Sequence, residues 1–301
     1  MSAEDQVDCI VRFHDIRRLP ELDRCVFSLV GQSYRPVNII LALQRFSAAE
    51  VATTRDALAP MLGLPGAPRL TIRNLEQPEP RDARTLLLNL GLRAAEGRYI
   101  GFLDYDDLLY PEAYDKLVSR LQATGAAIAF ATVRVVSADV YPQFVRVASE
   151  VKNPFGAGES LPDLFRGNFC PIHSFLLDRH AIDPEDLFFD TRLNWEEDYD
   201  FLLRICAKYP SDFGMIKTRI GEYYYKTDGS NSIPVDGLTT AAQRSAYSAV
   251  SALIEARRRT TIVSPEVQKR IGIMPARPGM TIRDFLDARP EANGQRPRAD
   301  R

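Results

Sequence analysis

Short apolar runs and amphipathic stretches alternate along the first half of the chain. The apolar runs, which are typical of buried strands, occupy residues 9–13, 37–43, 69–74, 98–103 and 126–136. Helices are predicted between them, beginning near Pro20 and near Ser47 and then spanning 82–96 and 111–122. This alternating order predicts an α/β fold with a mainly parallel, doubly wound sheet.

Two of these helices have clear start signals. Pro20 and Glu21 open the first one, because proline is favoured in the first helical turn and an acid is stabilised by the helix dipole there. Ser47 and Glu50 have the spacing of a capping box. Both helices are therefore predicted from local sequence alone.

The second half of the chain is less regular. A loop rich in Pro and Gly over 152–171 precedes a strand at 172–177, an acid-headed helix at 196–209 and an aromatic strand at 222–226. An alanine-rich helix over 239–258 follows and ends in three arginines. These arginines could contact a membrane or a partner, or they could simply be the cations that are favourable at a helix C-terminus. From about residue 275, Pro, Gly and Arg dominate, and a disordered tail over 275–301 is expected.

Composition narrows the class of protein. The 38 Lys and Arg against 40 Asp and Glu leave a net charge of -2, so the basic excess that drives nucleic-acid binding is missing. No apolar run approaches the ~20 residues of a membrane span. The four cysteines lie far apart in apolar runs and read as core residues in a reducing compartment. A cytoplasmic protein is expected.

Three carboxylates follow the strand at 98–103 within four residues. Asp104, Asp106 and Asp107 stand where a parallel strand ends, which is the edge that binds ligands in doubly wound sheets. Gathering such charges is unfavourable unless a cation or hydrogen-bond donors compensate them. A divalent ion carrying substrate phosphates would do so. The structural alternative is that these residues form a turn and cap the helix at 111–122.

Three segments of the chain resemble the family 2 glycosyltransferases of GT-A fold. Residues 95–111 (AEGRYIGFLDYDDLLYP) are similar to the family's Asp-x-Asp segment, and residues 22–36 (LDRCVFSLVGQSYRP) to its first helix. Residues 194–204 (NWEEDYDFLLR) are similar to its Glu-Asp block. The three blocks occur in family order within residues 7–232, and the resemblance implies a mixed GT-A sheet with helices on both faces and a C-terminal helical extension.

The resemblance implies roles for the acidic residues. Asp104 would contact the donor ribose, Asp106 would bind a metal that bridges the diphosphate, and Asp107 would support that geometry. Asp198, with Glu197 beside it in the catalytic block, matches the general base that takes the acceptor proton during an inverting displacement. The alternative is that the acids of this block only stabilise the first turn of the helix that follows, because negative charge is favourable at the positive end of the helix dipole.

The resemblance also implies further binding residues. Those for the nucleotide sugar are Phe13, Asp15, Gln44, Arg84, Tyr105 and Lys226, and those for the acceptor are His173 and Trp195. Three of these residues have a structural alternative. Arg84 could be a solvated helix residue, His173 a buried core histidine and Trp195 a packed ring.

Two positions depart from the family pattern. Gln44 and Arg45 stand where the family often has an acidic pair that holds the base, so uracil is only the default expectation. The family also often has a metal-binding His after an aromatic strand. One register puts Asp228 there, completing a Mn²⁺ or Mg²⁺ site with Asp104 and Asp106, and a shifted register puts Lys226 there, where its ammonium would meet the diphosphate. The first register is preferred, because the GSNS that follows matches better, although Asp228–Gly229 is also a plain turn signal.

These observations predict a metal-assisted, inverting transfer of sugar from a nucleoside diphosphate sugar to a saccharide or lipid-linked glycan. The predicted organisation is a GT-A domain over 1–238, in which 1–136 bind the donor and 137–238 the acceptor, and C-terminal helices over 239–274. Peripheral association at the inner face of a membrane and a homodimer are compatible with the sequence. The alternative is a catalytically silent homologue that binds nucleotide sugar or scaffolds a glycan-assembly complex.

Overall fold

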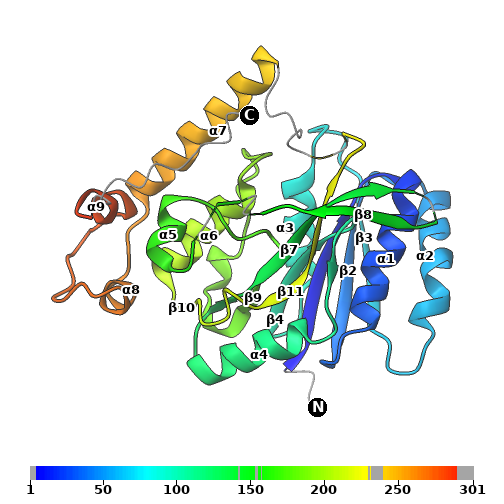
Figure 1. The fold of residues 1–301 in the computed structure, drawn as a ribbon, viewed down its shortest axis with the longest axis horizontal. Helices are drawn as coiled ribbons and strands as arrows, with labels where there is room; N and C mark the ends of the chain where they lie inside the picture. The colour runs from blue at the N-terminus through cyan, green and yellow to red at the C-terminus, as the bar shows by residue number, and fades with distance from the viewer. Residues whose placement is uncertain are drawn as a thin grey trace.

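The computed structural model describes residues 5–141, 143–152, 155–156, 158–229, 231 and 240–289. Its centre is a seven-stranded sheet in the order β10-β6-β9-β4-β1-β2-β3. In chain order these strands are β1 (Val7–Phe13), β2 (Val37–Gln44), β3 (Arg69–Leu75), β4 (Tyr99–Asp104), β6 (Ile128–Phe130), β9 (Phe175–Asp178) and β10 (Ser211–Asp212). β4, β1, β2 and β3 are parallel, and β9 runs antiparallel between β4 and β6. The prediction of a doubly wound mixed sheet is confirmed (Figure 1).

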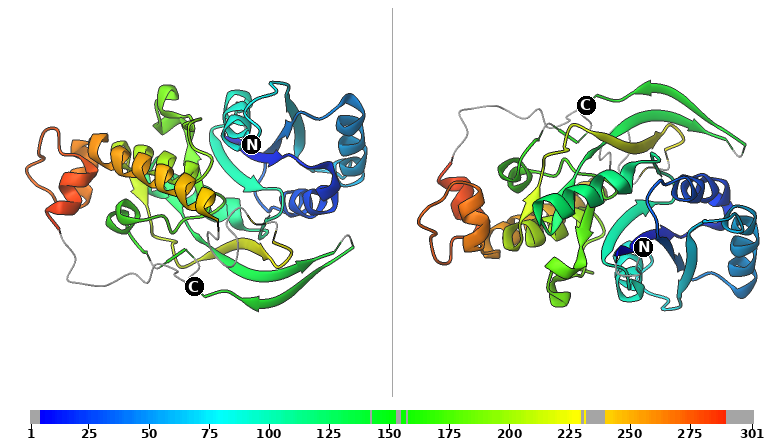
Figure 2. Two further views of the ribbon diagram at one scale, coloured as in Figure 1. Left: turned by 90° about the horizontal axis from the view of Figure 1, so that it is seen from above. Right: turned by 90° about the horizontal axis from the view of Figure 1, so that it is seen from below.

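A second sheet of four strands adjoins the first. It has the order β5-β11-β7-β8 and contains β5 (Leu108–Leu109), β7 (Thr132–Val140), β8 (Val145–Glu150) and β11 (Arg219–Lys226). β7 and β8 extend away from the large sheet as a hairpin (Figure 2). The single strand predicted over 126–136 is thus two strands in different sheets, because the chain leaves the large sheet at the buried Ala131.

Helices cover both faces of the large sheet. They are α1 (Leu19–Val30), α2 (Ala48–Leu62), α3 (Arg84–Ala94), α4 (Ala113–Thr124), α5 (Leu161–Arg166) and α6 (Glu197–Lys208), with short 3-10 turns at Ile16–Arg18, Arg179–Ala181 and Pro184–Asp186. Apolar residues of α1, α2 and α4 share one hydrophobic cluster, and those of α3, α5 and α6 share the other. β1 serves both clusters, since Val11 faces the first and Ile10 the second. Cys9, Cys25, Cys170 and Cys206 are free and buried, as predicted.

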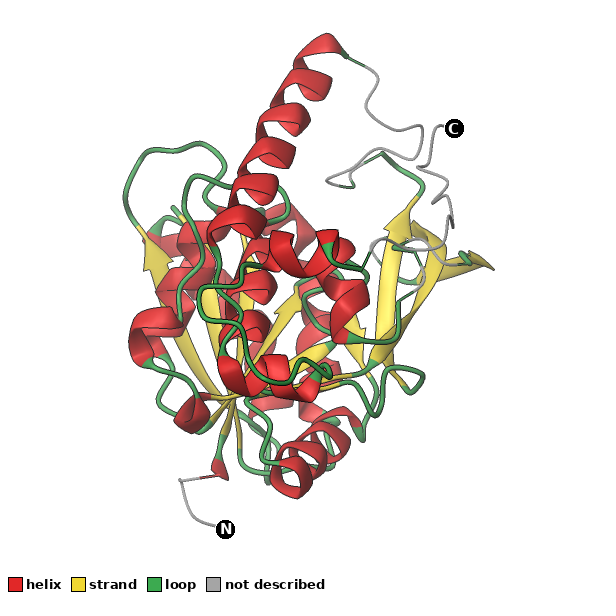
Figure 3. Ribbon diagram, turned by 90° about the vertical axis from the view of Figure 1, so that its left-hand side faces the viewer, coloured by secondary structure: helices red, strands yellow, loops and turns green. Residues whose placement is uncertain are grey.

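The C-terminal extension consists of α7 (Ala241–Thr260), α8 (Pro265–Arg270) and α9 (Ile282–Asp287). Figures 1 and 3 show one end of α7 projecting from the body, while its other end lies near α8 and α9. The expected disordered tail over 275–301 needs correction, because Thr281 caps α9 and the helix buries Ile282 and Phe285. The rest of that predicted tail, 290–301, lies outside the described residues.

The strand register decides what meets at the carboxyl edge of the large sheet. Arg12 of β1 pairs with Asp104 of β4, and Phe13 pairs with Leu43 of β2. Residues distant in sequence therefore emerge together at this edge. Within the described part of the chain, no helix is both long and apolar enough to cross a membrane.

Candidate active site

Asp104, the last residue of β4, is held by Arg12 of the neighbouring strand. Arg12 Nε lies 2.5 Å from Oδ1 and Nη2 lies 3.1 Å from Oδ2, so the guanidinium meets the carboxylate with two donors. Burial favours the neutral acid, but the Arg12 charge and hydrogen bonds outweigh it and leave the pKa of Asp104 below its usual value. Asp104 is therefore an anion in the folded protein.

The same arginine reaches the second acidic block. Arg12 Nη1 donates to Glu197 Oε1 at 2.7 Å, and only 7% of the Glu197 side chain is exposed. Arg12 thus connects the end of β4 with the start of α6, although 92 residues separate it from Asp104 and 185 from Glu197. The two blocks that the resemblance pointed to are adjacent in space.

Asp106 lies beside a buried lysine. Lys226, the last residue of β11, places Nζ 2.7 Å from Asp106 Oδ2 and 3.6 Å from Glu21 Oε2, and 3% of its side chain is exposed. Burial opposes the charge, yet Asp106 and Glu21 outweigh it and raise the pKa of Lys226. Nζ also lies 5.7 Å from the centre of the Tyr105 ring. Lys226 is therefore a fixed cation within the carboxylate cluster.

Asp107 is buried and linked to the small sheet. It accepts a hydrogen bond from the Tyr224 backbone N–H at 2.8 Å, and its Oδ2 lies 3.5 Å from His173 Nδ1. Burial, together with the charges of Asp106 and Asp104, raises the pKa of Asp107 well above its usual value. Burial likewise lowers the pKa of His173 to about 4. Near neutral pH the His173 ring is therefore uncharged, and the raised pKa of Asp107 favours its neutral form.

His173 itself is a core histidine beside the carboxylate cluster. Its ring stacks on Tyr223 with centroids 6.1 Å apart, and neither ring nitrogen has a hydrogen-bond partner among the described residues. His173 therefore lies buried beside Asp107 and not at the surface of the site.

Asp198 lies in the first turn of α6 with its carboxylate facing Asn168. Oδ1 accepts from the Tyr199 N–H at 2.7 Å and lies 3.4 Å from Asn168 Nδ2. Burial raises the pKa of Asp198 to about 8, with the nearby Glu197 and Glu196 acting in the same direction. Such a carboxylate binds a proton more readily than an ordinary aspartate, which suits a general base.

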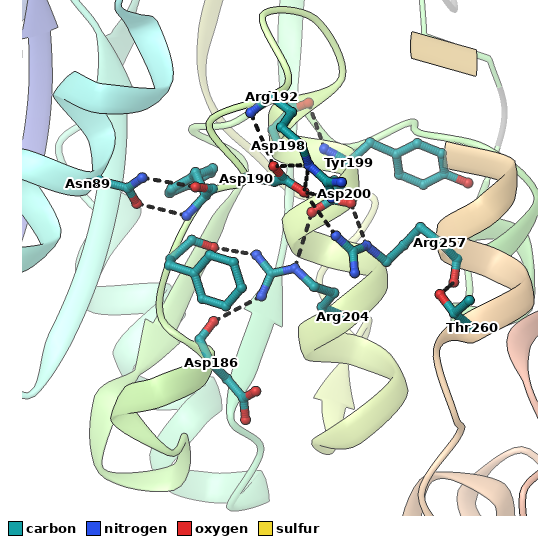
Figure 4. Close-up of polar contacts among 12 residues, drawn as sticks. Asn89, Asp186, Asp190, Arg192, Asp198, Tyr199, Asp200, Arg204, Arg257 and Thr260 are labelled. Carbon is teal, nitrogen blue, oxygen red and sulfur yellow. Dashed lines mark hydrogen bonds and ion pairs between the residues drawn. The ribbon is translucent and has the colours of Figure 1, made fainter. Parts of the chain in front are cut away.

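Ion pairs hold the start of α6 in place (Figure 4). Asp200 Oδ1 accepts from Arg257 Nε of α7 at 2.6 Å, and Oδ2 accepts from Arg204 Nε at 3.1 Å. Arg258 donates to the Tyr199 hydroxyl at 2.9 Å. Two of the three arginines that ended the predicted helix thus bind inside the protein, where they lock α7 against the turn that carries Asp198.

The other predicted donor residues lie around this edge in separate contacts. Phe13 packs on Tyr105 with ring centroids 5.2 Å apart, which brings both next to Asp104 and Asp106. Asp15 caps the 3-10 turn at Ile16–Arg18 and forms an ion pair with Arg17. Gln44 donates a hydrogen bond to the Arg81 carbonyl at 3.0 Å. Arg84 forms an ion pair with Asp82 at 2.9 Å.

Trp195, which was predicted to bind the acceptor, packs against an aromatic residue of α7. Its ring centroid lies 6.2 Å from that of Tyr247, whose hydroxyl lies 3.4 Å from Glu196 Oε1. Tyr247 was not predicted from the sequence, because nothing in the alanine-rich helix marks it as part of a site.

The carboxylates predicted to bind a metal do not converge. Asp104 is paired with Arg12, Asp106 with Lys226, and Asp228 lies 3.1 Å from Arg18 Nη2 instead of joining the other two. In the described part of the chain, no three His, Cys, Asp or Glu residues are grouped so as to hold a metal ion. The side chains at this edge therefore fit a set of carboxylate–cation pairs and not a divalent-cation site.

Sequence reasoning missed Arg12 and Glu21, which complete these pairs. The only signal for Arg12 is a charge one residue before the end of an otherwise apolar strand. Such a residue is costly to bury alone, so it predicts an acidic partner without saying which one.

Comparison with known proteins supports the resemblance. The sequence profile described as "Glycosyl transferase family 2" matches residues 16–183. The succinoglycan biosynthesis protein ExoO of Rhizobium meliloti (strain 1021) is 32% identical over 126 residues, which are 40% of this chain and 36% of that protein. This chain therefore spans about a third of the length of that curated relative.

Solved structures share the fold at low identity. S. aureus TarS 1-349 in complex with UDP aligns with a TM-score of 0.59 and 12% identity over 94% of this chain and 71% of that one. The same TarS fragment was solved with UDP-GlcNAc. The mannosyltransferase PcManGT from Pyrobaculum calidifontis, in complex with GDP-Man and Mn²⁺, aligns with a TM-score of 0.50 and 14% identity over 94% and 69% of the two chains.

Proposed function

Because the chain belongs to glycosyl transferase family 2, we propose that it transfers a sugar from a nucleoside diphosphate sugar to a hydroxyl group of a glycan. The observation that carries this proposal is the pair of hydrogen bonds from Arg12 to Asp104 and to Glu197. Through Arg12, the Asp-x-Asp segment at 95–111 and the Glu-Asp block at 194–204 lie side by side. UDP is the first candidate nucleotide, since TarS was solved with UDP and UDP-GlcNAc, and GDP is the second, since PcManGT was solved with GDP-Man.

In the proposed reaction, the acceptor hydroxyl oxygen attacks the anomeric carbon of the donor sugar. The bond between that carbon and the β-phosphate oxygen breaks, and the nucleoside diphosphate leaves with the electron pair. Asp198 takes the proton of the acceptor hydroxyl, which is the role its raised pKa suits. Attack from the face opposite the leaving group inverts the anomeric configuration.

Asp104 would hold the donor ribose beside Tyr105 and Phe13, and Arg84, Asp15 and Gln44 would border the nucleotide. Trp195 would border the acceptor, whereas His173, which is buried beside Asp107, would support the site from within the core. The proposed acceptor is a saccharide or lipid-linked glycan at the cytoplasmic face of a membrane, in line with the polysaccharide named for the relative ExoO. The divalent cation that the resemblance also implies would need Asp104, Asp106 and Asp228 to converge, whereas each of these carboxylates is paired with an arginine or a lysine.

Calorimetric titration of UDP and GDP tests donor binding. One of the two should bind, and Asp104→Asn should weaken that binding about 10- to 100-fold, because a charged hydrogen bond to the ligand is lost. Asp56→Asn, an exposed change on α2, is the matched control and should leave binding unchanged. If neither nucleotide binds under any condition, the proposal is wrong.

The pH dependence of transfer tests the base. Because Asp198 must be deprotonated to accept a proton and its pKa is raised to about 8, kcat/KM should rise with pH and level off above that value. Below it, kcat/KM should fall about tenfold per pH unit, as expected for one essential base. Circular dichroism over the same range separates this loss from unfolding. A profile that stays flat down to pH 5 would contradict the assignment.

A further inference from the structure

Lys226 occupies the centre of the acidic cluster at the carboxyl edge of the sheet. It is the last residue of β11, directly after the aromatic residues Tyr223–Tyr225, and its ammonium lies 2.7 Å from Asp106. Its backbone is fixed as well, since Asn231 Oδ1 accepts from the Lys226 N–H at 2.8 Å. The position of the ammonium is therefore set by the fold and not by a flexible side chain on the surface.

The ammonium has capacity for another ligand. Of its three N–H donors, one hydrogen bond is made to a described residue, Asp106, while Glu21 lies at 3.6 Å, beyond hydrogen-bond distance. Glu21 Oε2 has no hydrogen-bond partner among the described residues. Glu21 and Arg18 also line a cavity of about 390 Å³. Lys226 does not itself line that cavity, but its ammonium lies 3.6 Å from Glu21, which does. The N–H donors that no described residue takes are suited to an anionic group.

A divalent ion would be repelled at the same place. An ion on the Asp106 carboxylate would sit within a few ångströms of Nζ, and two cations at that distance in a buried site repel each other strongly. Asp104 offers no compensation, because Arg12 already meets both of its oxygens, and Asp228 lies with Arg18.

We propose that Lys226 takes the place of a divalent cation, so that the nucleoside diphosphate binds to the ammonium directly and donor binding does not depend on metal. This inference rests on the proposed function. When the bond between the anomeric carbon and the β-phosphate oxygen breaks, the electron pair stays on that oxygen, and the Lys226 N–H groups stabilise the new charge. Asp106 then orients the ammonium instead of binding a metal.

The test is calorimetric titration of UDP and GDP in EDTA and in Mn²⁺, on the wild type and on Lys226→His. The wild type should bind its nucleotide equally well in both conditions. Lys226→His should lose about 10- to 100-fold in affinity in EDTA, the size of a lost charged contact, and regain affinity with Mn²⁺ because imidazole and Asp106 can share the ion. Lys269→His, an exposed change on α8, controls for metal binding by an added histidine.

One further variant keeps the test decisive. Lys226→Arg preserves the charge and should bind nucleotide in EDTA, which decides the matter even if the histidine variant does not fold. Wild-type binding that appears only with Mn²⁺ would overturn this inference and leave the proposed function standing. Absence of nucleotide binding in both conditions would overturn the two together.

Discussion

Replacing Asp198 by Asn is expected to lower the rate of sugar transfer about 10²- to 10⁴-fold, the usual contribution of a general base. The amide has nearly the same shape and its oxygen can still accept from the Tyr199 N–H, so the start of α6 should keep its geometry. The variant loses only the ability to take the acceptor proton. Nucleotide affinity should therefore remain at the wild-type value while kcat falls.

The comparison needs a control of the same kind. Asp115→Asn is matched, because Asp115 also lies in the first turn of a helix, α4, but is exposed and remote from Arg12 and Asp104. It should leave transfer unchanged. Thermal unfolding of both variants checks the fold, and Asp198→Asn should not be destabilised, since it removes one of three neighbouring acids. Transfer by Asp198→Asn at the wild-type rate would remove Asp198 as the base.

Replacing Arg12 by Met is expected to lower the free energy of unfolding by about 3–5 kcal/mol, which is typical when one partner of a buried ion pair is removed. The methionine fills much of the volume, but Asp104 and Glu197 are left facing each other without a cation. Unfolding in urea, followed by circular dichroism, measures the loss. Nucleotide binding should weaken as well, because Asp104 then no longer has a fixed orientation.

A double replacement separates charge from packing. Adding Glu197→Gln to Arg12→Met should recover part of the lost stability, since one of the two uncompensated charges disappears. Arg17→Met is the matched control, because Arg17 is 85% exposed and its pair with Asp15 is solvated, and it should leave the urea midpoint unchanged. If Arg12→Met also unfolds at the wild-type urea concentration, the bridge does not hold the site together.

Local sequence determined most of the secondary structure and the identity of the acidic groups. The capping box of Ser47 and Glu50 starts α2 as predicted, because its contacts span only three residues. The apolar runs became buried strands of the predicted sheet, and Asp104 stands at a strand end, where the pattern placed it. The family motifs lie in such short segments, which explains why the family could be identified from the sequence.

Tertiary structure alone decided how the charges are paired. Arg12 meets Asp104 because β1 and β4 are neighbours in register, and it meets Glu197 because α6 begins at the same edge. Whether Lys226 or Asp228 lies beside Asp106 depends on where β11 ends against β7. A charged side chain is attracted to any opposite charge nearby, whatever their separation in the sequence. The sequence therefore gives the charged residues, whereas strand order and register determine which of them pair.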